Sequence, residues 1–173
     1  SSFGANIILS SRNEDELLKV ANQCSTETLI IPLDLAKQDN FTEATKKVCE
    51  KFKTIDYLIN NGGISQRSKA TETNLEVDRL LMEINYFGTI ALTKAVLPIM
   101  QNQQRGHIIT ISSLSGKFGF FLRSAYAAAK FAQVGFFESL RLEEEKNKIN
   151  VSIVFPGFVK TNISQNALSG SGK

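Results

Sequence analysis

The sequence predicts an α/β protein in which a mostly parallel sheet is covered by helices on both faces. Short β-branched apolar runs alternate with amphipathic stretches of a dozen or more residues along nearly the whole chain. Connections of that length favour right-handed crossovers between parallel strands. The length of 173 residues fits one domain, residues 1–173, with enough interior for a sizeable core.

The first half of the chain carries three strand signals and two helix signals. Asn13 supplies an N-cap and residues 14–16 an acidic first turn, so a helix is expected to follow the first strand directly. The third strand closes on the turn Asn61-Gly62-Gly63. The expected strands are 5–10, 28–33 and 55–60, and the expected helices are 13–24 and 38–52.

The second half continues the alternation. A long apolar-periodic stretch predicts one helix over 74–101, with a kink near Pro98, and the next helix is expected over 124–146. Strands are expected at 107–112 and 149–155, and the Gly/Ser-rich tail 169–173 is expected to be flexible.

Composition excludes several classes of protein. With 42% hydrophobic and 21% charged residues, the chain is neither disordered nor a coiled coil. Its 20 basic and 17 acidic residues leave a net charge of +3 that is scattered along the chain, so nucleic acid is not the expected partner. No apolar run approaches the roughly 18 residues of a membrane span and no signal-peptide pattern is present, which predicts a cytoplasmic protein unless a preceding segment carries an anchor.

Cysteine and histidine usage points away from metal chemistry. Cys24 and Cys49 lie in no pairing motif, so neither a disulfide nor a zinc site is expected. His107 is the single histidine, which excludes mechanisms that need several imidazoles from this chain. No metal site is predicted, and acid–base chemistry must come from other side chains.

Polar residues follow most of the expected strands. The carboxyl ends of parallel strands meet at one edge of a sheet, where ligands of open α/β sheets bind. Taken singly these residues are ordinary, because Asn-Gly is usually a turn, Ser-Ser a cap and Pro-Gly a structure breaker. The residues expected at this edge are Ser11-Arg12, Asp34, Asn60-Asn61-Gly62-Gly63, Ser112-Ser113 and Pro156-Gly157.

Tyr126 and Lys130 are the strongest candidates for chemistry. They lie four residues apart on an expected helix and therefore share one face. A nearby ammonium in a partly dry cleft lowers the pKa of a phenol, which makes the tyrosine a plausible general acid and base. The competing interpretation is a surface Tyr/Lys ladder without function. Ser113 weakens it, because it stands thirteen residues before Tyr126 at a strand end.

These spacings resemble those of the short-chain dehydrogenase/reductase family, and within it the branch of dehydrogenase/reductase member 7 and 11β-hydroxysteroid dehydrogenase relatives. Residues 60–63 look like the family's NNAG turn, with Gly62 in place of the usual alanine, and Asn85 falls on its helix asparagine. Residues 156–161 resemble its PG…T segment. The resemblance implies a Rossmann-type, doubly wound, three-layer αβα fold. It also implies an oxidoreductase that transfers a hydride between a nicotinamide dinucleotide and an alcohol or carbonyl.

The resemblance also implies roles for individual residues. Tyr126 would exchange the proton with the substrate oxygen, Ser113 would hold that oxygen, and Lys130 would lower the tyrosine pKa and grip the nicotinamide ribose. Asn85 would anchor a water in the proton relay. Asp34 would meet the adenine amino group, and Thr161 would lie near the carboxamide. The residues expected to bind the cofactor are Ser11, Arg12, Asp34, Leu35, Asn61, Gly62, Gly63, Tyr126, Lys130, Pro156, Gly157, Val159 and Thr161.

The residues after the first strand favour NADP(H) over NAD(H). An acid at that place accepts the ribose hydroxyls in NAD-preferring proteins of this fold, whereas Ser11 and Arg12 can both donate to a 2′-phosphate. The alternative is that Arg12 faces solvent or pairs with Glu14 or Asp15. The family's geometry implies that Phe118, Phe120, Phe121 and Phe158 line the mouth of the cleft, which favours an apolar substrate. The alternative is that these phenylalanines belong to the core, since the chain has twelve of them.

The sequence also departs from the family. The first strand and the glycine-rich turn that cradles the pyrophosphate are not found before residue 6, so an incomplete chain with two exposed strand edges is expected. A homodimer or homotetramer through the helices at 74–101 and 124–146 is the expected assembly. Two alternatives stay open, namely a catalytically silent sensor or scaffold of the same fold and a different α/β nucleotide-binding protein.

Overall fold

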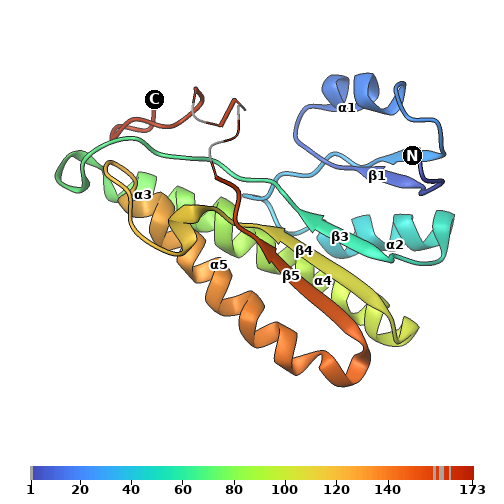
Figure 1. Ribbon diagram of the computed structural model, residues 1–173. Coiled ribbons are helices and arrows are strands. Elements are labelled where there is room, and N and C mark those ends of the chain that lie inside the picture. The colour runs from blue at the N-terminus through green and yellow to red at the C-terminus, as the bar shows by residue number, and fades with distance from the viewer. Residues whose placement is uncertain (1, 158, 160–161, 164) are drawn as a thin grey trace.

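The computed structural model describes residues 2–157, 159, 162–163 and 165–173. Five strands alternate with helices, and every strand pairing is parallel. The strands form two separate sheets, one of order β1-β2 and one of order β3-β4-β5 (Figure 1). The α/β class and its parallel crossovers are therefore confirmed, whereas the single continuous sheet is divided in two.

The smaller sheet is built by the first thirty residues. β1 (Ile7–Leu9) pairs with β2 (Thr28–Ile30), and α1 (Glu14–Ala21) connects them and packs against β2. The Asn13 side chain accepts a hydrogen bond from the Glu16 amide at 3.2 Å, which confirms the expected N-cap. Both strands are shorter than the apolar runs that contain them.

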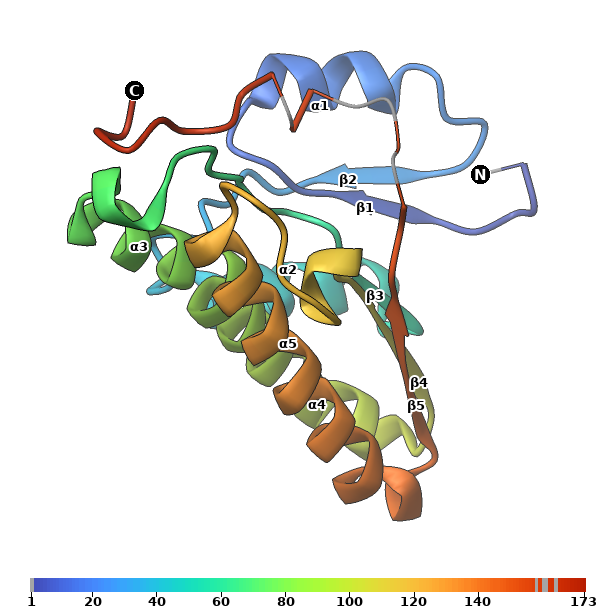
Figure 2. The ribbon, with the colours of Figure 1, turned by 60° about the vertical axis from the view of Figure 1, so that its left-hand side comes forward.

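The larger sheet is covered on one face by the two long helices of the chain. β3 (Tyr57–Asn60), β4 (Gly106–Ile111) and β5 (Ile149–Val154) lie side by side, with α4 (Thr89–Gln103) and α5 (Ser124–Glu143) packed against them (Figure 2). α2 (Phe41–Phe52) packs against α4. α2 begins three residues later than expected, and Gln38, just before it, donates its side-chain amide to the Glu83 carboxylate at 2.5 Å.

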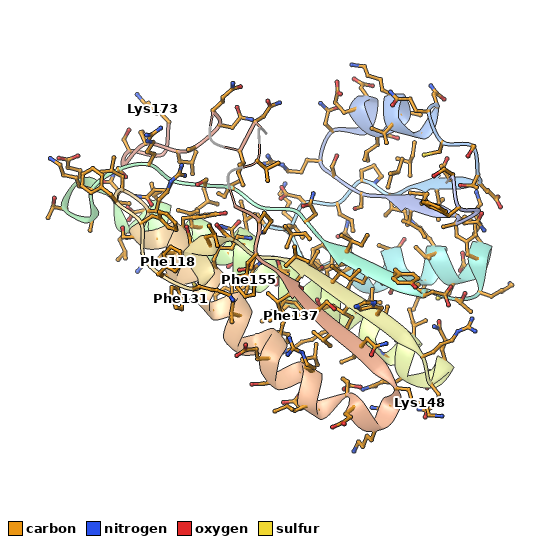
Figure 3. All side chains as sticks on the ribbon, viewed as in Figure 1. Phe118, Phe131, Phe137, Lys148, Phe155 and Lys173 are labelled. Atoms are coloured by element: carbon orange, nitrogen blue, oxygen red, sulfur yellow. The ribbon has the colours of Figure 1, made fainter. Side chains whose placement is uncertain are left out.

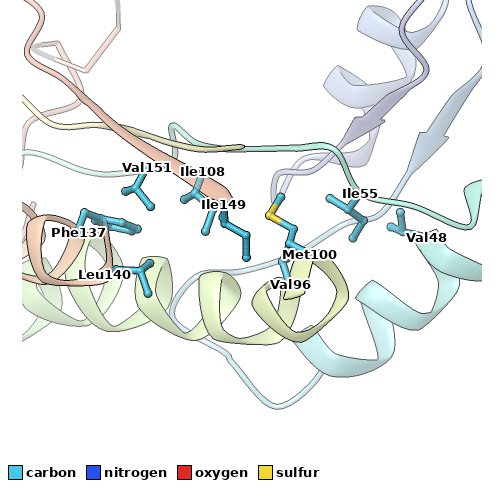
Figure 4. Packing of buried hydrophobic residues seen from close by; sticks show 9 residues of the cluster. All are labelled: Val48, Ile55, Val96, Met100, Ile108, Phe137, Leu140, Ile149 and Val151. Carbon is cyan, nitrogen blue, oxygen red and sulfur yellow. The ribbon is translucent and has the colours of Figure 1, made fainter. Parts of the chain in front are cut away.

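The core lies between this sheet and its helices. Its nine buried side chains come from α2, α4, α5, the sheet and the loop before β3, and Phe137 and Met100 are fully enclosed (Figure 4). Burial of this apolar surface is the main force that fixes both helices on the sheet. The residues are Val48, Ile55, Val96, Met100, Ile108, Phe137, Leu140, Ile149 and Val151.

The long helix expected over 74–101 is interrupted, but not where proline predicted it. α3 (Leu75–Met82) passes into a π-helical turn, η2 (Glu83–Gly88), and then into α4, which contains Pro98. The irregular turn contains Asn85, and π-turns inside helices are frequent at functional sites. The sequence did not predict this turn, because a π-turn has no single-residue signal as strong as proline, and the kink near Pro98 stays a prediction.

The two sheets face each other across unpaired edges. Among the described residues, β1 pairs only with β2 and β3 only with β4, so one edge of each strand has no partner. The side chains of Tyr57 and Ile59 on β3 are 67% and 61% exposed. Large apolar side chains in a parallel sheet are normally covered, and the exposed edges expected from the sequence are confirmed.

The end of the chain is more ordered than its composition suggested. α5 ends at Glu143, before a 3₁₀ turn (Glu145–Asn147). Beyond residue 165, Leu168 forms a parallel bridge to Gln66, and the Asn74 amide donates to the Gly170 carbonyl at 2.9 Å. The expectation of a flexible tail was wrong for this segment, because its backbone groups find partners in the loop before α3.

One helical stretch, Leu75–Gln103, is long and apolar enough to cross a membrane. No such segment was expected from the sequence. Length and composition alone are weak evidence, because the core helix of a globular domain passes the same test. Val77, Leu81, Val96 and Met100 of this stretch are buried inside the domain.

Candidate active site

Tyr126 occupies a buried position near the start of α5. It packs with Val77 and Leu81 of α3 and with Ala125. Burial raises the pKa of the Tyr126 phenol above its ordinary value, while the Ser113 side chain and the Arg123 cation act to lower that pKa. The net direction differs from the sequence expectation, and Lys130 is not among the causes.

Ser113 stands where β4 leads into a short 3₁₀ turn, η3 (Leu114–Gly116). Its extended backbone makes it the N-cap of that turn, and its hydroxyl accepts from the Ser115 amide at 3.1 Å. The Ser113 side chain lies near the Tyr126 phenol and acts to lower its pKa. The twelve residues between them therefore return the chain to the same place, as the spacing predicted.

Lys130 lies one helical turn after Tyr126 and is 4% exposed. Its ammonium donates to the Ile111 carbonyl at 2.9 Å and to the Gln133 side-chain oxygen at 3.1 Å. The ammonium nitrogen is 5.8 Å from the centre of the Tyr126 ring. Burial lowers the pKa of Lys130 to about 8, because desolvation penalises the charged form.

Asn85 is fully buried in the π-helical turn η2. Its side-chain oxygen accepts from the Ile64 amide at 2.8 Å, and its side-chain nitrogen donates to the Ile64 carbonyl at 2.9 Å. Its backbone carbonyl accepts from the Thr89 hydroxyl at 2.9 Å and from the Gln133 amide. The side chain thus ties the loop after β3 to the helix, and the carbonyl faces α5.

Sequence reasoning missed Arg123, which lies at the entrance to α5. Its guanidinium donates to the Ser65 hydroxyl and to the Gln66 carbonyl, the latter at 3.1 Å, and sits 5.9 Å from the centre of the Tyr126 ring. Burial, followed by the neighbouring Arg67, lowers its pKa, while Tyr126 acts to raise it, and the guanidinium remains a cation at neutral pH. No motif marks it, since only the fold brings residues 65, 66 and 123 together.

The residues expected to hold the adenosine half follow β1 and β2. Ser11 and Arg12 are exposed, and the Ser11 hydroxyl exchanges long hydrogen bonds with the Asn13 backbone at 3.3 and 3.4 Å. Across the described part of the chain Arg12 forms no ion pair, so the alternative pairing with Glu14 or Asp15 is not observed. The Asp34 carboxylate accepts from the Ala36 amide at 3.0 Å.

The glycines after β3 permit close packing between the two halves of the site. A Cβ on Gly62 would lie 2.7 Å from the Leu35 side chain, and one on Gly63 would lie 2.8 Å from the Asn85 side-chain oxygen. Gly88 leaves room for the Leu35 carbonyl. The turn Asn61-Gly62-Gly63 therefore joins the segment after β2 to the π-helical turn.

Of the segment after β5, the structure describes Pro156, Gly157 and Val159, of which Val159 is exposed, while Thr161 and Phe158 lie outside the described residues. The rings of Phe118 and Phe120 are tilted against each other at 5.1 Å between centres, and the Lys117 ammonium lies over the Phe155 ring. The side chains of Phe118 and Phe155 are labelled in Figure 3. Phe121 is 84% exposed and borders a surface hollow of about 530 Å³ with Arg67, Lys69 and residues 169–171. That hollow contains none of the four expected catalytic residues.

The residues present fit the nicotinamide dinucleotide that the sequence implies. The Lys130 ammonium, the Tyr126 phenol and the Ser113 side chain gather where β4 ends, and polar donors follow β1 and β2 at the same carboxyl edge. A parallel α/β domain with a Ser/Tyr/Lys group at this edge defines the class of short-chain dehydrogenases. A family model described as "short chain dehydrogenase" matches residues 1–171, and the chain belongs to this family.

Curated relatives give the branch. The chain is 43% identical to Dehydrogenase/reductase SDR family protein 7-like of Drosophila melanogaster, over 98% of this chain and 54% of the relative. It is 40% identical to SDR family member 7B of Mus musculus, with the same coverage, and 42% identical to member 7 of Homo sapiens, over 98% of this chain and 52% of the relative. The chain spans about half the length of these curated relatives.

Solved structures show the same fold. A short-chain dehydrogenase from Streptomyces avermitilis superposes with a TM-score of 0.88 at 31% identity, over 94% of this chain and 61% of the other. A tyrosine-to-phenylalanine variant of ElxO with NADPH bound gives 0.84 at 28% identity, over 91% and 65%. NAD⁺-bound xylitol dehydrogenase gives 0.84 at 23% identity, over 88% and 60%, a likeness that shows the fold alone.

Proposed function

We propose that this chain carries the catalytic centre of an oxidoreductase that interconverts an alcohol and a carbonyl, with Tyr126 as general acid and base. The observation that carries the proposal is the convergence of Ser113, Tyr126 and Lys130 at the end of β4, with Asn85 bridged to Lys130. Three elements supply these groups, which argues against a surface Tyr/Lys ladder.

Each residue of the candidate site has a separate role in the proposed reaction. Tyr126 keeps its proton in the ligand-free chain because burial raises its pKa, so it is ready to donate to a carbonyl oxygen. Ser113 holds that oxygen, and the Arg123 cation favours the phenolate once the proton has left, while the Lys130 ammonium lies 5.8 Å from the centre of the Tyr126 ring. A bound nicotinamide dinucleotide supplies or accepts the hydride.

NADP(H) is the favoured cofactor, with NAD(H) as the alternative. Arg12 is exposed and unpaired within the described ranges, and Ser11 stands beside it at the end of β1. Together they offer a guanidinium fork and a hydroxyl to a 2′-phosphate. The ElxO variant was solved with NADPH and xylitol dehydrogenase with NAD⁺, so relatives of this fold bind both.

An apolar alcohol or carbonyl is the favoured substrate. Phe118 is half exposed and stacks on Phe120 just after η3, within a few residues of Ser113. An exposed aromatic pair that follows Ser113 closely in the chain favours substrates with apolar bodies. Cytoplasmic location and assembly as a homodimer or homotetramer through α4 and α5 stay predictions.

Replacing Tyr126 with phenylalanine tests the function. The change removes the transferable proton and almost no volume, so turnover is expected to fall at least about 100-fold while dinucleotide binding persists. Turnover over a panel of apolar carbonyls and alcohols and binding by nucleotide fluorescence are measured on the same protein. Binding without turnover in the unmodified chain would favour the silent sensor or scaffold, and a variant that keeps more than a tenth of the rate would refute the role of Tyr126.

A further inference from the structure

Gln133 is a buried polar residue to which sequence analysis gave no role. It lies on α5 one turn after Lys130, and its side chain is 1% exposed. A primary amide removed from water is costly unless its oxygen and nitrogen both find partners. Gln133 lies beside the buried Lys130 ammonium, so both polar atoms of its amide need hydrogen-bond partners.

The Gln133 amide bridges two elements of the candidate site. Its oxygen accepts from the Lys130 ammonium at 3.1 Å, and its nitrogen donates to the Asn85 carbonyl in η2 and lies 3.4 Å from the Thr89 hydroxyl oxygen. The orientation of the amide follows from chemistry, because an ammonium can only donate and a carbonyl can only accept. One side chain thus connects α5 to the π-helical turn.

The Gln133 bridge helps to fix the directions in which the Lys130 ammonium donates hydrogen bonds. Two of its three N–H groups are used by the Ile111 carbonyl and by Gln133, and the third has no acceptor among the described residues. The Asn85 side chain cannot take over the role of Gln133, because both of its polar atoms bond to Ile64. Within the described part of the chain, Gln133 alone connects the ammonium to the helix that carries Asn85.

We propose that Gln133 is a positioning residue that fixes the Lys130 ammonium between β4 and the π-helical turn and stabilises its charged form. This inference rests on the proposed function, since it acts on the lysine of that site. Without the amide oxygen the ammonium would lose one of its two fixed acceptors. Lys130 would then be free to turn away from Tyr126 and would give up its proton at lower pH.

Few charged groups surround this lysine. Tyr126 is its neighbour on α5, and Arg123 stands beyond the tyrosine ring. On the packed elements, Glu83 of η2 is bonded to Gln38, Lys117 lies over Phe155, and Asp78 of α3 faces the start of α5. Burial is the cause that lowers the Lys130 pKa to about 8, so two neutral acceptors, the Ile111 carbonyl and the Gln133 amide, are the groups that support its charge.

The test measures the Lys130 pKa in the full chain by NMR of labelled lysine side chains, with Lys130→Arg to assign the signal. Gln133→Leu is expected to make proton binding to Lys130 at least about ten-fold weaker, because a hydrogen bond to a charged group is lost. Gln133→Glu keeps an acceptor and adds a negative charge, so it is expected to raise the pKa above about 8. Gln101→Leu is the matched control, since Gln101 donates to the distant Glu144 carboxylate at 2.9 Å.

These measurements need no turnover, so they stand even if the proposed function fails. Where turnover is found, Gln133→Leu is expected to lower kcat about ten-fold, with little change in KM, and to shift the pH profile with the Lys130 pKa. An unchanged Lys130 pKa in folded Gln133→Leu overturns the proposal. If that variant does not fold, a Lys130 pKa that fails to rise in Gln133→Glu overturns it equally.

Discussion

The buried ammonium of Lys130 makes the stability of this protein depend on pH, and replacing it with methionine exposes that dependence. Burial lowers the pKa of Lys130 from 10.5 to about 8 in the folded chain, whereas an unfolded chain leaves it in water at its ordinary value. Between these two pH values the unfolded state binds more protons than the folded state. The free energy of unfolding must therefore rise as pH rises through this window.

The size of the effect follows from the two pKa values. Each pH unit inside the window contributes about 1.4 kcal/mol, and partial titration near its ends reduces the total. Between about pH 7 and 9.5 the wild-type chain is expected to gain about 2 kcal/mol of stability relative to Lys130→Met. Absolute stability at one pH is a poor measure, because methionine also leaves the Ile111 carbonyl and the Gln133 oxygen without their donor.

The assay is urea unfolding of both chains at several pH values across this range. Lys146→Met serves as the control, because it removes an exposed ammonium just beyond the same helix and should leave the pH dependence unchanged. If the wild-type chain gains less than about 0.5 kcal/mol of stability relative to Lys130→Met across this pH range, the reasoning is refuted. Such a result would mean that Lys130 is hydrated in the folded chain.

Two further changes test the cofactor side and the glycine turn. Arg12→Ala is expected to lower the preference for NADPH over NADH by about 10- to 100-fold in kcat/KM, because a charge-assisted contact to the 2′-phosphate is lost; a wild-type preference for NADH would contradict this. Gly63→Ala is expected to cost about 1 to 3 kcal/mol in thermal or urea unfolding, because its Cβ would meet the Asn85 side-chain oxygen at 2.8 Å while that oxygen is held by Ile64. Gly62→Ala is the matched control and should cost less than about 1 kcal/mol, since the Leu35 side-chain end at 2.7 Å can move. Equal losses of stability in the two variants would show that the Asn85 contact is not what requires glycine at position 63.

Local signals in the sequence were sufficient for much of the fold. Each of the five expected strands is present, because β-branched runs bounded by polar residues form strands in nearly any context. The Asn13 cap was predictable because its hydrogen bond spans three residues. Boundaries moved by a few residues, as at α2, which begins at Phe41 rather than at Gln38.

Spacing along the chain also determined the candidate site. A helix places Tyr126 and Lys130 one turn apart, and the strand end places Ser113 beside them, so these relations follow from the periodicity of single elements. The direction of the Tyr126 pKa did not follow, because it depends on burial against Val77 and Leu81 of α3. Spacing in the sequence determines which residues are neighbours within one helix or strand. It does not determine which of them another element shields from solvent.

Only the tertiary structure decided the long-range polar contacts. Arg123 reaches Ser65 and Gln66 across more than fifty residues, and Gln133 joins Lys130 to Asn85 across forty-eight. Such contacts leave no periodic trace in the sequence, because they depend on how whole helices pack rather than on local backbone preference. The sequence by itself determined which elements form and which chemical groups they carry. Packing determined which of those groups are dry, charged and in contact, because desolvation and hydrogen bonding act between elements that are distant in the chain.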